Sequence, residues 1–423
     1  MSTDTPVAEL RAKYRRDYDP YTRTIGITEQ LAELADRREA MPVSYSARGN
    51  GCWVLTRYDD IAGVLRRSNR GFISFPNEPD GVNTQGSEVQ QIPIELDGSR
   101  HQQFRAMLDP LFSPKRVNEL ADGLREWAVR LIDGWIEQGS CDFVQGFALP
   151  FPGVTVMKIM GWPEEDVDRL NNWVDIVMHG LPDATQEETD AARAKAHGEI
   201  REYMFALIAQ RRAEPRRDDV TSAALDLELD GVKLTDVELF DLFLLMMFAG
   251  LDTVQSVLSQ AMAYLGRHPE QWDHMFESPE MLASAIEEFL RWGTPPVPTR
   301  TVVYDEIQVG ELMLPKGERV HFPLAIANRD PDYYENPDEV VLDRFVAAGA
   351  KPHIAFGMGA HRCVGVHLAR LELRIAFEEL RRRLPAFRLD ADYEPREHLG
   401  LAWGIDNVHL LFEPAGATEG ADA

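Results

Sequence analysis

A run of ten apolar residues, Leu242 to Leu251, constrains this fold more than any other feature of the sequence. A helix that spans a bilayer needs about 20 apolar residues. The shorter run therefore predicts a helix that is buried on all sides inside a large core. Thr235 and Glu238 have the spacing of a capping box, which sets the start of that helix. We predict a helix over Thr235–Arg267 that other helices surround.

Most of the remaining sequence also has helical periodicity. Apolar residues recur every three or four positions in long segments, whereas strand-like stretches bounded by Gly, Pro or charged residues are few and short. This balance predicts a mainly α fold with a small β portion. The predicted helices are Asp59–Arg67, Pro114–Gln138, Thr189–Arg212, Pro279–Arg291 and Val364–Leu384, and the predicted strands are Cys52–Thr56, Thr301–Val303, Ile307–Val309 and Arg319–Phe322.

The composition indicates one large domain. The 423 residues are 44% hydrophobic and 27% charged, which is ordinary for a globular protein, and no Gly/Ser-rich or Pro-rich linker divides the chain after its N-terminal part. We predict a partly mobile N-terminal arm over residues 1–40, a single domain over residues 41–413 and a disordered tail over residues 414–423. We expect the protein to be a monomer.

Charge and cysteine content exclude several classes of protein. The net charge of −26 disfavours nucleic acid and anionic membranes as partners. Cys52, Cys141 and Cys363 are too few and too scattered for a disulfide framework, which indicates a reducing compartment. Residues 1–16 lack the apolar core of a secretory signal or membrane anchor. We therefore expect a soluble, cytoplasmic protein.

Cys363 lies in the glycine-rich segment Phe356-Gly-Met-Gly-Ala-His-Arg-Cys-Val-Gly365, directly before a predicted helix. The free amides and the dipole of a helix N-terminus favour a thiolate, which is the form of cysteine that binds metals. The glycines allow the backbone to come close to a flat ligand. A buried structural cysteine is the common alternative. A zinc site using His361 and Cys363 lacks the usual second pair of cysteines.

The pattern F-G-x-G-x-H-R-C-x-G resembles the haem-binding signature of the cytochrome P450 family. Three further motifs resemble that family in the expected order, so the resemblance covers the chain from about Trp53 to Phe412. It implies the cytochrome P450 fold, with haem b between the long central helix and the helix that follows the cysteine. It also implies a monooxygenase that uses dioxygen as cosubstrate. The residues of this segment implied to hold the haem are Phe356, Gly357, His361, Cys363 and Gly365, with Cys363 on the iron.

The segment Ala249-Gly-Leu-Asp-Thr253 in the central helix resembles the family's oxygen-activation segment. The resemblance implies that Ala249 and Gly250 lie at the haem and that Gly250 leaves room for dioxygen. It implies a catalytic role for Asp252 and Thr253 in delivering protons. A threonine inside a helix commonly donates instead to the carbonyl four residues earlier, and without the cysteine motif this alternative has equal weight.

Glu288-Phe-Leu-Arg291 resembles the E-x-x-R motif of the family, whose spacing places both charges on one helix face. The resemblance implies that Arg344, in a later segment, completes a structural ion-pair group with them. Taken alone, such a pair is more often part of a solvated helix surface.

His101 and Arg105 resemble the H-x-x-x-R pair of the helix that crosses the edge of the haem. The resemblance implies that these two residues bind the haem propionates together with Arg300 and His361. Arginine suits this role because its guanidinium matches a carboxylate. Each of these residues taken alone is more often a surface cation.

The positions implied to lie over the haem are apolar, which predicts a small hydrophobic substrate. The segments around Gly250 and Ile92 look most like the camphor-hydroxylating branch of the family. However, Val89 stands where that branch has the tyrosine that binds the camphor ketone, so a terpenoid, an aromatic compound and a fatty compound all remain open. The implied pocket residues are Val89, Leu245, Phe248, Val297, Leu401, Ala402 and Trp403.

No flavin, nicotinamide or iron–sulfur motif occurs in the sequence. The resemblance therefore implies a separate ferredoxin, served by an NAD(P)H-dependent reductase, that docks beneath Cys363. The candidate docking residues are Lys115, Arg116, Lys351, Arg362 and Arg370. The alternatives are a peroxygenase that uses hydrogen peroxide, which the Asp252–Thr253 pair disfavours, a haem-based binding or sensor protein without catalysis, and a structural protein without haem.

Overall fold

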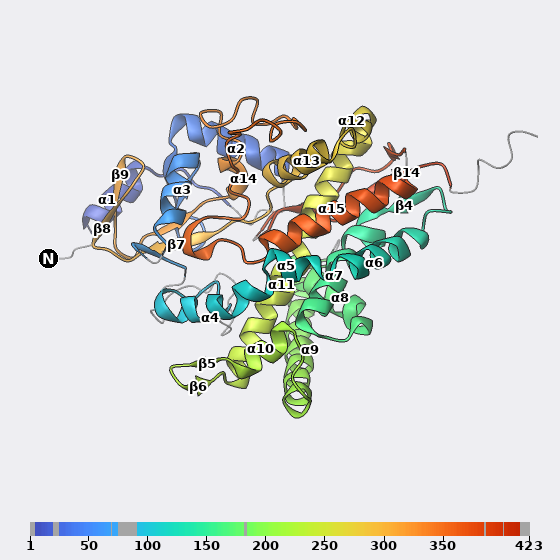
Figure 1. The fold of residues 1–423 in the computed structure, drawn as a ribbon. Helices are drawn as coiled ribbons and strands as arrows, with labels where there is room; N and C mark the ends of the chain where they lie inside the picture. Colours follow the sequence, from blue (N-terminus) through green and yellow to red (C-terminus); the bar gives the residue numbers. More distant parts are fainter. Residues whose placement is uncertain are drawn as a thin grey trace, which may run out of the picture.

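A computed structural model describes residues 5–19, 25–68, 70–74, 91–181, 184–384, 386–400 and 402–414. Its longest helix, α11 (Asp236–Arg267), passes through the centre of the molecule (Figure 1). The Thr235 side chain accepts a hydrogen bond from the backbone of Glu238, and the Glu238 side chain accepts one from the backbone of Thr235. The predicted capping box and the predicted extent of this helix are therefore confirmed.

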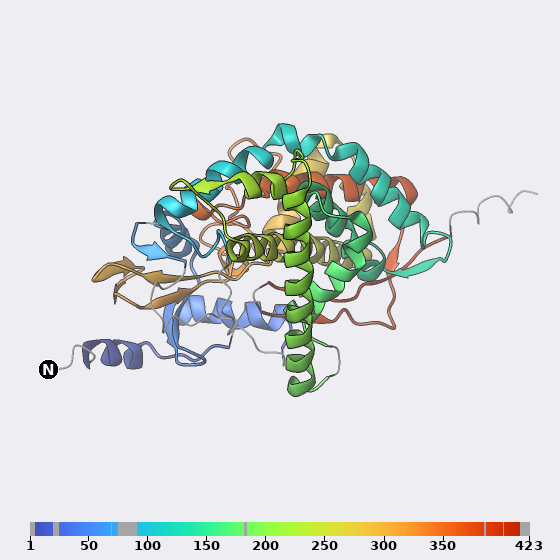
Figure 2. The ribbon, with the colours of Figure 1, turned by 90° about the horizontal axis from the view of Figure 1, so that it is seen from below.

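Other helices surround α11, as the apolar run predicts. In Figure 2 the long helix α9 (Gln186–Ala213) lies across α11, with which it is in contact. The helices α7 (Pro150–Met160), α8 (Val167–Met178), α13 (Pro279–Trp292) and α15 (Val366–Arg383) also pack against it. Their apolar faces and α11 form the larger of two hydrophobic cores.

A five-stranded sheet organises the second core, on the left in Figure 1. Its strand order is β1-β2-β10-β7-β3, and only the β10–β2 pair is parallel. Buried side chains of this core include Trp53, Val54 and Val320. The strands are β1 (Val43–Ser46), β2 (Cys52–Leu55), β3 (Phe72–Ile73), β7 (Thr299–Val302) and β10 (Arg319–His321).

The remaining elements are short and lie around these two cores. The helical ones are α1 (Thr5–Lys13), α2 (Ile27–Ala40), α3 (Tyr58–Arg66), α4 (Gly98–Leu111), α5 (Pro114–Asn118), α6 (Ala121–Asp133), η1 (Val144–Ala148), η2 (Glu164–Asp166), α10 (Val220–Asp226), α12 (Pro269–His274), α14 (Leu324–Ala327) and η3 (Gly359–His361). The remaining strands are β4 (Ser140–Asp142), β5 (Glu228–Leu229), β6 (Val232–Lys233), β8 (Glu306–Val309), β9 (Leu312–Pro315), β11 (Arg388–Leu389), β12 (Glu397–His398), β13 (Gly404–Ile405) and β14 (His409–Leu411).

Two segments differ from the sequence prediction. The single helix predicted over Pro114–Gln138 is divided into α5 and α6, and both parts pack on α15. In the predicted N-terminal arm, α2 buries Ile27, Leu31 and Leu34 in the core of the sheet. These apolar contacts make α2 part of the folded body, whereas the predicted boundary at residue 40 separates it from the domain.

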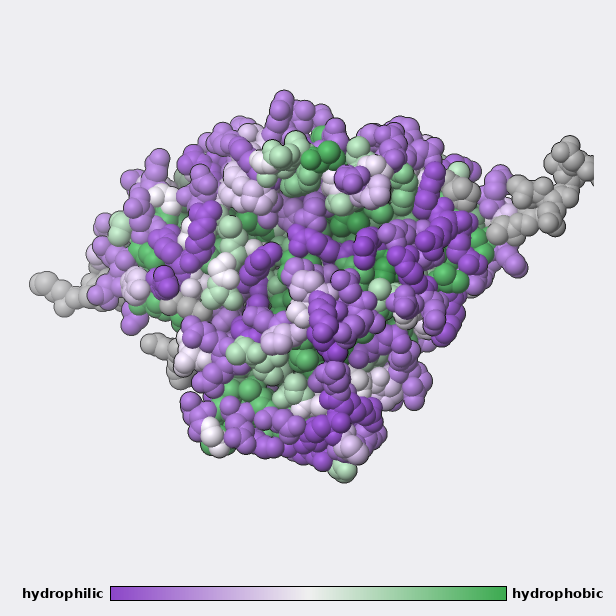
Figure 3. All heavy atoms as spheres, viewed as in Figure 1, coloured by the Kyte–Doolittle hydropathy of each residue, from purple (hydrophilic) through white to green (hydrophobic). Residues whose placement is uncertain are grey.

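Polar and charged residues cover most of the face shown in Figure 3, with smaller apolar areas between them. Within the described residues, no helix combines the length and the apolar character that crossing a membrane requires. Most of the apolar run of α11 is instead buried in the protein, and Met246, Ala249 and Gly250 are the members that are not.

Candidate functional site

A cavity of about 460 Å³ lies where α11, α4, β7 and the segment before α15 meet. This volume is in the usual range of small-molecule sites. Cys363 lines the cavity together with residues of α11, among them Ala249, Gly250, Asp252 and Thr253 of the segment Ala249–Thr253. The structure thus brings two motifs that are more than one hundred residues apart to the walls of one cavity.

The backbone before α15 presents Cys363 to this cavity. The backbone N–H of Cys363 donates to the carbonyl of Phe356 over 2.9 Å. Gly359 has a φ of 69°, and a Cβ atom at this position would lie 2.5 Å from the carbonyl oxygen of Leu65. Glycine is therefore required here both by the backbone conformation and by the close contact with α3.

The thiol of Cys363 is exposed towards the cavity and otherwise surrounded by protein. Burial raises the pKa of this thiol above its usual value, while the Gly365 amide and Arg105 act in the opposite direction. The helix α15 begins at Val366, and the amide of its N-cap residue Gly365 acts on Cys363 in the direction predicted for a helix N-terminus, while burial acts against it. A metal cation at the sulfur deprotonates a thiol outright.

The four cations implied to bind propionates all line this cavity. Burial lowers the pKa of His101 to about 4, with further lowering by His361 and Arg105, and burial lowers the pKa of Arg300 to about 10. His101 Nδ1 and Arg300 Nε are buried and have no hydrogen-bond partner within the described part of the chain. His361 Nε2 lies 3.0 Å from Asp97 Oδ1.

Buried donors without partners are costly unless a ligand satisfies them. A planar group with two carboxylates, a metal for the sulfur and an apolar body fits this combination of cations, thiol and apolar walls. The residues present therefore fit a haem, with Cys363 as the ligand of its iron and the four cations around its propionates.

On α11, the Thr253 hydroxyl donates to the Ala249 carbonyl over 3.0 Å, which is the common contact of a threonine inside a helix. Asp252 is 3% exposed and forms an ion pair with His179, whose Nε2 lies 3.0 Å from Asp252 Oδ1. Burial by itself raises the pKa of Asp252, but His179 and His398 hold it below the usual value. The carboxylate is therefore ionised at neutral pH.

Comparisons with known proteins decide the family. The family model described as cytochrome P450 matches residues 164–399. A methyl-branched lipid omega-hydroxylase of Mycobacterium bovis is 33% identical over 366 residues, covering 82% of this chain and 83% of its own. The chain belongs to the cytochrome P450 family.

Two further relatives agree with this assignment. A steroid C26-monooxygenase of Mycolicibacterium smegmatis is 33% identical to this cytochrome P450, covering 76% of this chain and 79% of its own. The solved structure of P450BioI with an acyl carrier protein ligated to hexadec-9Z-enoic acid matches with a TM-score of 0.80 at 26% identity, covering 91% of this chain and 98% of that one. The predicted fold, haem b and the use of dioxygen by a monooxygenase are thus confirmed at the level of the family.

The Glu288, Arg291 and Arg344 side chains of this cytochrome P450 form one buried group. Arg291 donates to both carboxylate oxygens of Glu288 over 2.7 Å, and Arg344 Nε lies 3.0 Å from Glu288 Oε2. Arg291 also donates to the backbone carbonyls of Asn328, Pro337 and Glu339. The group therefore connects α13 to the segment that leads to the cysteine.

Four of the predicted pocket residues line the cavity, namely Leu245, Phe248, Val297 and Ala402. Trp403 does not line it: this side chain is 1% exposed and belongs to the core of the sheet. Adjacent residues of an extended segment point to opposite sides, so Ala402 and Trp403 could not both face the ligand. Val89 and Leu401 lie outside the described residues.

The space beside Gly250 is filled by Val156 of α7. A Cβ atom at position 250 would lie 2.4 Å from Val156 Cγ2. We expect Gly250→Ala to lower the free energy of unfolding, because overpacking costs about 1–3 kcal/mol and exceeds the roughly 1 kcal/mol gained in helix propensity. Urea midpoints measure the change. Adding Val156→Ala removes the clash, so a double variant no more stable than Gly250→Ala would contradict this explanation.

Glu372 of α15 was not found from the sequence, where it is one of many helix glutamates. It lines the cavity and is 3% exposed, and burial raises its pKa to about 8, while a hydrogen bond with Thr155 acts in the opposite direction. The pKa is raised on folding, so the contribution of Glu372 to stability is complete below the unfolded pKa, near 4.5, and is lost as the pH rises through 8.

We therefore expect Glu372→Gln to become more stable relative to the unchanged protein as the pH rises from 5 to 8. The expected slope is about 1.4 kcal/mol per pH unit. Thermal midpoints across this range measure it, with Glu280→Gln, an exposed position on α13, as the control. A difference that is constant with pH would show that Glu372 is ionised throughout.

Proposed function

We propose that this cytochrome P450 hydroxylates an aliphatic hydrophobic substrate, fatty or terpenoid, with electrons from a separate ferredoxin. The observation that carries the proposal is the cavity, in which Cys363 and the Asp252–Thr253 pair share a space with apolar walls. Besides the predicted Leu245 and Phe248, the walls include Met178, Met246 and Ile94. Unbranched methionines adapt to substrates of different shape, and relatives are named for lipid and steroid substrates.

Different residues of the cavity have different roles in the proposed reaction. When bound, haem supplies an iron that activates dioxygen for insertion into a C–H bond, and thiolate ligation by Cys363 favours cleavage of the O–O bond. His101, Arg105, Arg300 and His361 would hold the propionates of the haem. Apolar walls exclude water from the substrate, and Thr253 and Asp252 deliver protons.

A chain of polar groups leads from Asp252 towards the surface. Asp252 is paired with His179, and His179 Nδ1 lies 3.1 Å from the carboxylate of Asp175, which is 41% exposed. The imidazole thus lies between the buried Asp252 carboxylate and the more exposed Asp175 carboxylate and holds Asp252 in position. The arrangement supports the role of Asp252 in proton delivery and adds His179 as a positioning residue.

We expect Thr253→Ala to consume reducing equivalents at a comparable rate but to form product with an efficiency lowered about 10-fold or more, the scale of a lost proton-transfer group. The ratio of product to NAD(P)H consumed measures this effect. Thr294→Ala, a buried threonine in the turn after α13, serves as the control. Unchanged coupling in Thr253→Ala, or full activity with hydrogen peroxide alone, would favour the peroxygenase alternative.

The substrate class is tested by titrating the purified protein with fatty acids, terpenoids and small aromatic compounds and recording the haem Soret band. A substrate that displaces water from the iron shifts this band. The proposal predicts shifts with the aliphatic compounds. Shifts with aromatic compounds alone would contradict it, and the absence of product with any donor would favour a binding or sensor protein.

The proposed docking residues differ in whether a carboxylate of the protein already pairs with their positive charge. Arg116 pairs with Glu119 and Asp218, and Arg370 pairs with Glu287. Lys115, Lys351 and Arg362 are exposed. Since a paired arginine attracts a further anion less, the proposal for an acidic ferredoxin depends mainly on the three exposed cations.

A further inference from the structure

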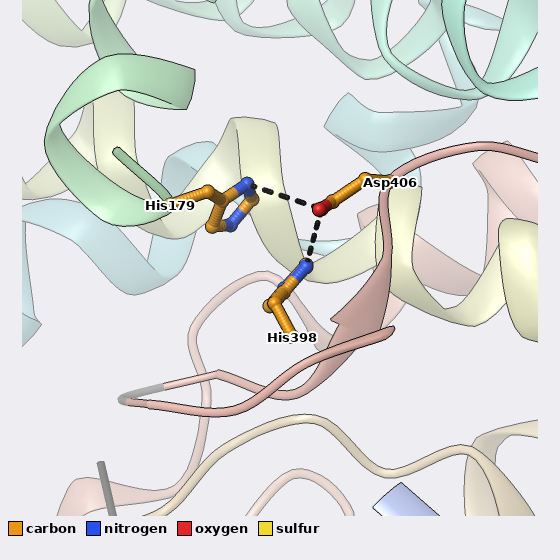
Figure 4. Close-up of side chains that lie close together, drawn as sticks. All are labelled: His179, His398 and Asp406. Carbon is orange, nitrogen blue, oxygen red and sulfur yellow. Dashed lines mark hydrogen bonds and ion pairs between the residues drawn. The ribbon is translucent and has the colours of Figure 1, made fainter. Parts of the chain in front are cut away.

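Figure 4 shows a second group of chemically active side chains, which adjoins Asp252 of the cavity lining through His179. His179 follows α8, and His398 and Asp406 belong to the β12–β13 hairpin and the residue after it. These residues can each offer one ligand atom, and the three atoms lie within 4.8 Å of one another. Asp406 Oδ1 is 2.6 Å from His398 Nδ1 and 3.8 Å from His179 Nδ1. The two imidazole rings are stacked, with centroids 3.8 Å apart, and the Nδ1 atoms of both lie beside Asp406 Oδ1.

A fourth candidate ligand atom lies beside His179. Asp175, one turn earlier on α8, places Oδ1 3.1 Å from His179 Nδ1. Zinc bound at about 2.0–2.1 Å by four tetrahedral ligands separates those ligand atoms by roughly 3.3 Å. The observed separations of 2.6, 3.1 and 3.8 Å lie around this value. Binding of one ion requires one of the two stacked rings to turn, so that both Nδ1 atoms point to it.

The charges of the group favour a divalent cation. Asp175, Asp252 and Asp406 carry three negative charges, and Arg396 is the permanent cation beside them, with Nε 3.0 Å from Asp406 Oδ2. That contact leaves Asp406 Oδ1 directed to the two imidazoles. With both imidazoles neutral, the group has a net charge of about −2, which one divalent ion balances. Burial opposes any uncompensated charge in such a place.

The surroundings also hold the imidazoles as a metal site requires. A Cβ atom at Gly404 would lie 2.9 Å from His398 Nε2, so the hairpin backbone packs against that edge of the ring. His179 Nε2 lies 3.0 Å from Asp252 Oδ1, and Oδ2 of the 3% exposed Asp252 has no hydrogen-bond partner within the described residues. A carboxylate on the far nitrogen of a metal-binding histidine fixes its tautomer and orientation.

We propose that His179 Nδ1, His398 Nδ1, Asp406 Oδ1 and the Asp175 carboxylate bind a divalent transition-metal ion of the zinc type. Imidazole ligands favour zinc, copper or nickel over magnesium and calcium, which prefer sites made only of oxygen. The ion links the β12–β13 hairpin to the end of α8. It also leaves the proton of His179 on Nε2, which lies 3.0 Å from Asp252 Oδ1. The site is separate from the haem and goes beyond the proposed hydroxylation.

Protons compete with this metal. Zinc binds imidazole nitrogens in their neutral form, so its apparent affinity should rise from pH 7 to pH 8. Binding should release protons, which calorimetry in buffers of different ionisation enthalpy detects.

The test uses the purified haem-containing protein, freed of other metals by a chelator and titrated with zinc chloride by calorimetry at pH 7 and pH 8. We expect one equivalent to bind with proton release, and magnesium and calcium to have no effect at the same concentration. His398→Gln and Asp406→Asn should each weaken binding at least about 10-fold. His274→Gln, which alters an exposed His–Glu pair on α12, should leave it unchanged.

Binding of less than one equivalent to the unchanged protein would overturn the proposal, as would unchanged affinity in both ligand variants. If these variants fail to fold by circular dichroism, Asp175→Asn provides the comparison, because that side chain is 41% exposed. A failure here is distinct from a failure of the proposed function, because zinc binding is measured by heat while the haem spectrum and product formation are measured independently.

Discussion

Replacing Cys363 by serine should abolish the thiolate-type spectrum of the reduced carbon monoxide complex. The sulfur faces the cavity, and the loop that presents it is held by the Phe356 carbonyl and by the close contact of Gly359 with Leu65. Removing the sulfur leaves the loop intact but removes the ligand that favours O–O cleavage. We expect product formation to fall more than about 100-fold, beyond the 10–100-fold that changes outside the ligand shell typically cause.

The matched control is Cys141→Ser, at a half-buried cysteine in β4 outside the cavity lining. It should keep both the spectrum and the activity. Haem content and the difference spectrum are measured on the same preparations. A thiolate-type band that persists in Cys363→Ser would show that another group binds the iron and would overturn the assignment of the site.

Replacing Glu288 by glutamine should destabilise the protein strongly. Glu288 and Arg291 are both 0% exposed, and the Glu288 carboxylate also accepts from Arg344 and from the backbone of Val341. Removing one charge of a buried pair leaves the other uncompensated, which costs about 3–5 kcal/mol. Urea midpoints of the haem-containing protein, followed by circular dichroism, measure this loss.

Arg382→Ala is the control for this experiment, because Arg382 pairs with Glu379 at the same i,i+3 spacing but is 64% exposed. A surface pair of this kind contributes at most about 1 kcal/mol. Equal midpoint shifts in the two variants would show that the Glu288 group has no special structural role. Retention of the haem spectrum below the transition separates a loss of stability from a loss of the cofactor.

The local signals in the sequence predicted much of this molecule. The capping box at Thr235 and the apolar run after it predict both the limits and the burial of α11, because these properties depend on neighbouring residues. The spacing of Glu288 and Arg291 likewise places their charges together on one helix face. The position of Cys363 opposite α11 was predicted from the resemblance to the family, because no local sequence pattern specifies a contact between such distant residues.

Other features depend on contacts that no local pattern encodes. His179, Asp252 and Asp406 are widely separated in the sequence, and only the fold brings them together. The expectation for Trp403 failed because one residue decides which side of an extended segment faces the core. The lack of space for a side chain at Gly250 could not be predicted either, because it depends on Val156 of another helix.

The cavity draws its walls from both hydrophobic cores. Leu108 and Phe248 belong to the helical core, whereas Leu65, Val297 and Leu324 belong to the core of the sheet. A ligand that touches both sets joins the two halves through its own apolar surface. Ligand binding therefore also stabilises the contact between the two cores. Substitutions of the cavity residues where the two cores meet should lower the ligand affinity and the thermal midpoint together.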